Sequence, residues 1–92
     1  MYDNLEHAML IVRGNCEICK QRIEKAALAV EGVYAATWNV QTEKLHLGFD
    51  PDRTGLEIIS EAIAKAGHET ELNRVDEKTY SLLPECCKYV RV

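Results

Sequence analysis

The spacing of apolar residues changes repeatedly along the first 72 residues, and this succession limits the possible folds more than any other feature. Short alternating or continuous apolar runs predict strands, whereas apolar residues three and four positions apart predict helices. Strand-like spacing is found at 8–12, 33–40, 45–49 and 68–72, and helical spacing at 17–30 and 56–66. This order predicts an α+β fold in which two helices cover one face of a four-stranded antiparallel sheet.

Local signals mark where the predicted helices begin and end. Gly32 and Gly67 follow the last periodic residues of the two helices, where a C-terminal glycine is common. Thr54, with Glu57 three residues later, forms a capping-box pattern that predicts the start of the second helix.

Two pairs of side chains in the predicted strands show no binding pattern. Tyr34 and Trp38 lie an even number of positions apart in one strand, so both are predicted to pack on the same face. His7 and His46 have no partner at ligand spacing and are predicted to be solvated strand residues.

Length, charge and composition argue against several classes of protein. The 92 residues are enough for one domain with one core. A net charge of −4 without a run of lysine and arginine makes a nucleic-acid partner improbable. The N-terminal apolar stretch is too short for a signal core or a membrane span. We therefore expect a soluble protein without membrane insertion, cytoplasmic if this is the whole precursor and periplasmic if an export signal has been removed. No catalytic pattern is recognisable, and no enzyme is expected.

Four cysteines carry the chemistry that the sequence suggests: Cys16 and Cys19 in a CxxC motif, and the adjacent Cys86 and Cys87. Adjacent cysteines are poorly placed for an unstrained disulfide with each other, which favours reduced thiols that bind metal. Cys16 is predicted at the first turn of the first helix, where N–H groups and the helix dipole stabilise a thiolate. Cys19 lies on nearly the same face, so both sulfurs can reach one soft ion. Cu(I) and Hg(II) accept two ligands, whereas Zn(II) normally takes four.

The predicted topology places the first strand's end, the first helix's start, the hairpin turn and the junction after the second helix at one end of the domain. His68, directly after Gly67, is therefore predicted to lie near Cys16 and Cys19. A neutral imidazole is a good ligand for copper or zinc, so His68 could be a third ligand. The alternative is a half-exposed histidine that only lies beside the site.

The C-terminal stretch is predicted to start at the opposite end of the domain, where the fourth strand ends. The 13 residues from Asn73 to Cys86 reach roughly 43 Å when extended, which is enough for a return to the metal site. Cys86 and Cys87 could then complete a three- or four-sulfur site and shift the preference toward Zn(II) or tightly held Cu(I). The alternative is a surface tail whose thiols bind metal adventitiously or oxidise.

The segment from Val12 to Lys20, with the junction Ala66-Gly67-His68 and the element order, resembles the heavy-metal-associated domain family. This family comprises copper chaperones, mercury-binding proteins and N-terminal modules of metal-transporting P-type ATPases. The resemblance covers about 7–72 and implies a ferredoxin-like βαββαβ fold, metal held by the CxxC cysteines, and transfer by ligand exchange. It divides the chain into a domain at 1–73 and a tail at 74–92.

Two positions depart from the family pattern. The family usually carries a methionine packed under the metal-binding loop, where this chain has Gly14 and Asn15, which predicts a more mobile loop. At the junction after the second helix the family often has tyrosine, phenylalanine or lysine, where this chain has His68.

The leading hypothesis is a chaperone or sequestering domain that carries Cu(I), or alternatively Zn(II) or Hg(II), on Cys16 and Cys19. Its expected partner is a metal-transporting P-type ATPase or another thiol metalloprotein, and its expected state is a monomer or a metal-bridged dimer. One alternative is a thiol-disulfide oxidoreductase that uses the CxxC pair. Another is an interaction module in which the cysteines are incidental.

Overall fold

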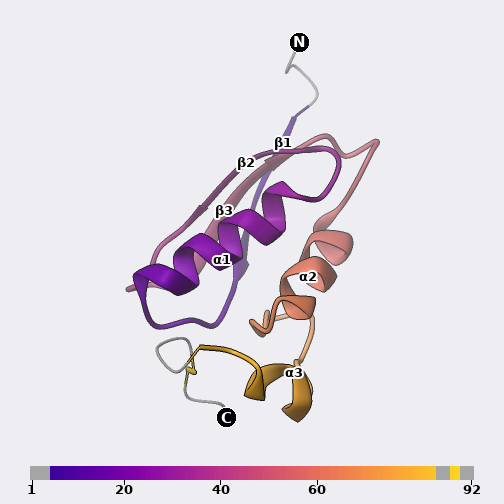
Figure 1. The fold of residues 1–92 in the computed structure, drawn as a ribbon. Helices are drawn as coiled ribbons and strands as arrows, with labels where there is room; N and C mark the ends of the chain where they lie inside the picture. The colour runs from indigo at the N-terminus through magenta and orange to yellow at the C-terminus, as the bar shows by residue number, and fades with distance from the viewer. Residues whose placement is uncertain (1–4, 85–87, 90–92) are drawn as a thin grey trace.

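The computed structural model describes residues 5–84 and 88–89 and shows an α+β fold (Figure 1). Its elements are β1 (Glu6–Ile11), α1 (Glu17–Leu28), β2 (Val33–Trp38), β3 (Lys44–Phe49), α2 (Leu56–Lys65) and α3 (Glu77–Ser81). The three strands form an antiparallel sheet in the order β1-β3-β2. Leu45 in the central strand lies opposite Leu10 of β1 and Trp38 of β2, so the inward face of the sheet is apolar.

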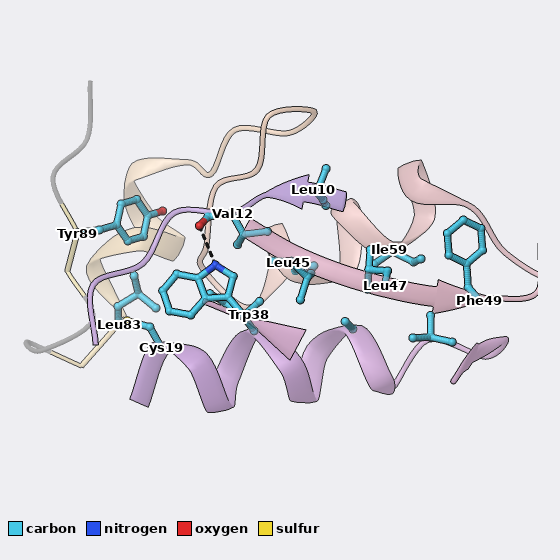
Figure 2. Packing of buried hydrophobic residues seen from close by; sticks show 14 residues of the cluster. Leu10, Val12, Cys19, Trp38, Leu45, Leu47, Phe49, Ile59, Leu83 and Tyr89 are labelled. Atoms are coloured by element: carbon cyan, nitrogen blue, oxygen red, sulfur yellow. Dashed lines mark hydrogen bonds between the residues drawn. The ribbon is translucent and has the colours of Figure 1, made fainter. Parts of the chain in front are cut away.

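The first two helices lie on one face of the sheet and bury their apolar sides against it (Figure 1). Ile23 of α1 and Ile59 of α2 are fully buried, as helical spacing predicts for the inward faces. The core runs without interruption from Phe49 at one end of the sheet to Cys19 at the other (Figure 2). The predicted α+β class is therefore confirmed, and α1 and α2 lie within the two predicted helical ranges.

The prediction of a full fourth strand at 68–72 is wrong, because only one bridge forms there. Thr70 pairs with Val12 in antiparallel orientation. The amide of Ile11 donates to the side chain of Glu71, at 2.9 Å, instead of to a backbone carbonyl. The Thr70 hydroxyl accepts the amide hydrogen bond of Asn73, at 2.9 Å, and this local bond turns the chain away from the sheet.

Two local predictions also fail for identifiable reasons. The N-cap of α2 is Gly55, and no side chain caps this helix, so the capping box predicted at Thr54 does not form. Thr54 instead packs against Gly32, whose φ of +100° suits a glycine. Tyr34 is 45% exposed because the register shifts between Val33 and Ala35, which breaks the alternation that would place it beside Trp38.

The C-terminal stretch begins beside α2, where the Ser60 hydroxyl donates to the side chain of Asn73, and not at the opposite end of the domain as predicted (Figure 1). The third helix, α3, was not predicted; its N-cap Asp76 accepts a hydrogen bond from the Thr79 amide at 2.8 Å. Leu83 and Tyr89 from this stretch join the same hydrophobic core as Cys19 (Figure 2). None of the helices in the described part of the chain is both long and apolar enough to cross a bilayer.

Candidate metal centre

The two cysteines of the CxxC motif lie together at the start of α1. Cys16 is the N-cap residue of this helix, with an extended backbone, and its carbonyl accepts the amide of Lys20 at 3.1 Å. The sulfur atoms of Cys16 and Cys19 are 3.4 Å apart, and neither residue forms a disulfide. The sequence prediction that this turn brings two thiols to one point therefore agrees with the geometry.

The two thiols differ in their surroundings. Cys19 is fully buried and belongs to the hydrophobic core, whereas Cys16 is partly exposed. The thiol of Cys19 donates to Oδ1 of Asn15 at 3.3 Å. One sulfur is thus fixed by packing, while the other can be reached from solvent.

The loop before Cys16 is held by the hairpin turn and by the junction after α2. The Val12 amide donates to the carbonyl of Glu43 at 2.9 Å, and the Gly14 amide donates to the carboxylate of Glu43 at 3.2 Å. On the other side, the Arg13 amide donates to the carbonyl of Glu69 at 2.7 Å. These contacts confirm that the hairpin turn and the junction meet the CxxC loop at one end of the domain.

Trp38 fills the space under the loop, against Gly14. A Cβ atom at Gly14 would lie 2.9 Å from the Trp38 ring and 3.1 Å from the Cβ of Cys19, so any side chain there would clash. The indole N–H of Trp38 donates to the carbonyl of Val12 at 3.0 Å (Figure 2). Glycine at position 14 therefore makes room for the bulky Trp38 ring from β2. This packing contact holds the loop, whereas the sequence predicts a more mobile loop.

His68 is fully buried beside the loop instead of half-exposed. Its Nδ1 lies 2.9 Å from the carbonyl of Arg13, which can only accept, so Nδ1 carries the proton and donates. Its ring stacks on Tyr89 with centroids 5.7 Å apart. Nε2 is buried and has no hydrogen-bond partner among the described residues. In this conformation the His68 side chain anchors the loop by its hydrogen bond to the backbone carbonyl of Arg13.

Burial of the imidazole lowers the pKa of His68 below its ordinary value, and the nearby charge of Arg22 lowers it further, while the hydrogen bond to Arg13 opposes these effects. The unfolded chain therefore binds more protons than the folded chain below about pH 6.5. We expect the metal-free protein to have its full free energy of unfolding above this pH. It should fall as the pH drops below it, until the folded-state pKa is passed.

Urea unfolding between pH 7.5 and 5 measures this loss. His68→Asn keeps an N–H donor near Arg13 but cannot titrate, so its stability should depend less on pH over this range. His46→Asn is the matched control, because His46 is exposed on the sheet. An unchanged pH slope in His68→Asn would contradict the expectation.

The described residues contain no group of three histidine, cysteine or acidic side chains placed to hold one metal ion. His68 is therefore not brought into a common site with Cys16 and Cys19 in this conformation, and its role as a ligand stays a prediction. Cys86 and Cys87 lie outside the described residues, and their role stays a prediction too. The residue that follows them is close to the loop: the carbonyl of Lys88 lies 3.5 Å from Nδ2 of Asn15.

Several residues that shape the site were missed by sequence reasoning. The sequence patterns assign no site role to Glu43, Asn15 or Tyr89, and they assign Trp38 only to packing within a strand. Only the predicted meeting of the hairpin turn with the CxxC loop pointed toward Glu43, because a turn residue there can reach the loop amides. No local pattern singles out the other three, since their contacts join distant parts of the sequence.

Residues 11–69 match the heavy-metal-associated domain family, and the chain belongs to this family. The copper-exporting P-type ATPase of Staphylococcus saprophyticus is 34% identical over 67 residues, which are 72% of this chain and 8% of that protein. Copper-transporting ATPase 1 of Rhizobium meliloti is 42% identical over 59 residues, which are 62% of this chain and 7% of that protein. The chain thus spans less than a tenth of the length of these relatives.

Solved structures share the fold over most of their length. Oxidized MerP from Ralstonia metallidurans has a TM-score of 0.69 at 28% identity, covering 73% of this chain and 94% of that one. The N-terminal domain of a potential copper-translocating P-type ATPase from Bacillus subtilis, in the Cu(I)-loaded state, also has a TM-score of 0.69 at 28% identity, covering 79% and 92%. The fold is therefore of the ferredoxin-like, heavy-metal-associated type, as the sequence resemblance implied.

Proposed function

We propose that this protein binds one Cu(I) ion between Cys16 and Cys19 and either delivers it to a partner or sequesters it. The observation that carries the proposal is the approach of the two thiols to 3.4 Å at the first turn of α1, with one of them partly exposed. Thiolates prefer soft ions, and the unpaired amides of a helix start favour the negative charge that a thiolate carries.

Two cysteine sulfurs suit Cu(I) better than Zn(II), which prefers four ligands. At a metal–sulfur distance of about 2.3 Å, a tetrahedral angle requires sulfurs about 3.8 Å apart and a linear arrangement about 4.6 Å. Both exceed the separation of 3.4 Å, so a side chain must rotate outward on binding. Cys19 is held in the core, so Cys16 makes this movement. Zn(II) and Hg(II) remain alternatives.

The exposed side of the site suits ligand exchange with a second thiol protein. Cys16 is partly exposed, and Ile18 in the same turn is 47% exposed, which gives a docking partner an apolar contact beside the sulfur. Glu17 and Lys20 border this surface. The relatives are copper-exporting and copper-transporting ATPases, which supports a metal-transporting ATPase as the partner. The protein then acts in the reducing cytoplasm, as a monomer or a metal-bridged dimer, and catalyses no reaction of its own.

Two finer questions belong to the same proposal. Cys86 and Cys87 precede Lys88, whose carbonyl faces Asn15, and this position supports a contribution of their sulfurs to the bound ion. His68 would have to expose Nε2 to the ion while Nδ1 keeps its bond to the loop. The thiol-disulfide oxidoreductase alternative receives no support from the family or the relatives.

Anaerobic competition titration with Cu(I) and a chromophoric chelator tests the proposal. The reduced full chain should bind one ion tightly, and Cys16→Ser should weaken binding by about two orders of magnitude, or ~2.7 kcal/mol. Cys16→Ser is preferred to a change at Cys19, because Cys19 is part of the core. The double variant Cys86→Ser, Cys87→Ser should still bind one ion, and its affinity relative to the full chain measures what these two sulfurs contribute. Undiminished affinity in Cys16→Ser would overturn the proposal.

A further inference from the structure

The face of the sheet that α1 and α2 leave uncovered carries three side chains that bind soft metals. His7 and Met9 point outward from β1, and His46 points outward from β3. Both histidines are exposed, and Met9 is 43% exposed. Imidazole suits copper, and a thioether selects Cu(I) over harder ions. The sequence prediction that both histidines are solvated is confirmed, but their relation to each other appears only in the folded sheet.

The strand register brings the three side chains together. Met9 lies directly opposite His46, and His7 lies opposite Gly48. Opposite residues on one face have Cβ atoms about 4.5–5.5 Å apart, and diagonal neighbours about 7–8 Å apart remain within reach of long or aromatic side chains. His46 is therefore the direct neighbour of Met9 and the diagonal neighbour of His7.

Gly48 lets the His7 ring lean over the central strand. The Cε1 and Nδ1 atoms of His7 lie 3.5 and 3.6 Å from the position that a Cβ atom at Gly48 would take. The ring therefore covers the backbone of β3, the strand that carries His46 two residues earlier. The absence of a side chain at position 48 leaves room for the His7 ring there.

The surroundings of the group favour a monovalent ion. Met9 and His46 line one shallow hollow, whose charged residues are Lys44 of the sheet and Glu17 and Lys20 of α1, while His7 lies outside it. Lys44 lies two residues from His46 on the same strand face, so its positive charge opposes the binding of a divalent cation more than that of a monovalent one. The hollow therefore combines two soft donors with two lysines and one carboxylate, a net positive charge that disfavours Zn(II).

We propose that His7, Met9 and His46 form a second metal site, which takes a monovalent soft ion of the Cu(I) class on the open face of the sheet. Its neutral donors bind such an ion more weakly than the two thiolates do. The three side chains point away from the sheet face that α1 covers, and the site does not depend on the function proposed for Cys16 and Cys19. It adds a lower-affinity position from which the chain can take up or hold a second ion.

Silver(I), a monovalent soft ion that does not change oxidation state, is the probe. The full reduced chain is titrated anaerobically while NMR follows the ring protons of the three histidines and the methyl group of Met9. Signals of His7, Met9 and His46 should shift along one common curve, while those of buried His68 should not follow it. His46→Asn should raise the concentration of silver needed to shift His7 and Met9 by about tenfold.

Thr37→Val is the matched control, because Thr37 lies opposite His46 on the same face but is not one of the three ligands. It should leave the common curve unchanged. The proposal is overturned if the three signals follow unrelated curves, or if His46→Asn leaves the curves of His7 and Met9 unaltered. In the same titration, ultraviolet absorption from thiolate-to-silver charge transfer measures silver binding to Cys16 and Cys19. The absence of binding at one site can therefore be distinguished from its absence at the other.

Discussion

Replacing Trp38 by alanine should lower the free energy of unfolding by about 3–5 kcal/mol, as for other buried aromatic residues. The side chain is 1% exposed and lies between the sheet and the CxxC loop (Figure 2). Its removal leaves a cavity under Gly14 and deprives the Val12 carbonyl of its hydrogen bond. Domains of this size are stable by only about 5–15 kcal/mol, so this is a large share of the total.

Urea unfolding followed by far-ultraviolet circular dichroism measures the loss without relying on tryptophan fluorescence. Trp38→Phe keeps an aromatic ring but removes the N–H donor, and it should cost about 1–3 kcal/mol. Tyr34→Ala, an aromatic truncation in the same strand, should cost no more than about 1 kcal/mol because Tyr34 is half exposed. Equal losses for Trp38→Ala and Tyr34→Ala would show that the packing under the loop contributes little.

Local patterns were sufficient to predict the parts of the fold in which each residue's role depends on its near neighbours. Ile23 and Ile59 lie at helical spacing with other apolar residues, and both are buried where predicted. Cys16 and Cys19 are three residues apart across a helix start, so their convergence follows from helix geometry alone. The central part of the site was therefore predictable from a few consecutive residues.

Contacts between distant residues account for what the sequence did not predict. Nothing in the sequence near Gly14 indicates that a tryptophan from β2 packs under the loop. The last strand is cut short because the Tyr89 hydroxyl, from the C-terminal stretch, takes the hydrogen bond of the Glu69 amide at 3.0 Å. The Thr70 hydroxyl similarly takes amide hydrogen bonds of the following turn. Strand propensity takes no account of side-chain hydroxyls that compete for the backbone amides.

The C-terminal stretch supplies the second large effect, which two adjacent leucines can isolate. Leu83 is 5% exposed and lies against Gly67, whereas Leu82 is 78% exposed. Leu83→Ala should therefore cost about 2–5 kcal/mol, and Leu82→Ala no more than about 0.5 kcal/mol. Both substitutions remove the same atoms from neighbouring positions, so the difference reports burial. Similar small losses at both positions, measured by urea unfolding, would mean that this stretch is only a surface tail.

Tyr89 extends this prediction to the metal-site loop. Its hydroxyl donates to the carbonyl of Gly67 at 2.9 Å and accepts from the Glu69 amide, while its ring covers His68. Tyr89→Phe should cost about 1–3 kcal/mol, because two buried backbone groups lose their partner. Tyr89→Ala should cost about 3–5 kcal/mol and also uncover His68.

Because burial is the main cause of the lowered pKa of His68, NMR titration should find this pKa closer to its ordinary value in Tyr89→Ala. An unchanged pKa would mean that the sheet and α2 alone shield the imidazole, and that the C-terminal stretch does not control access to the loop.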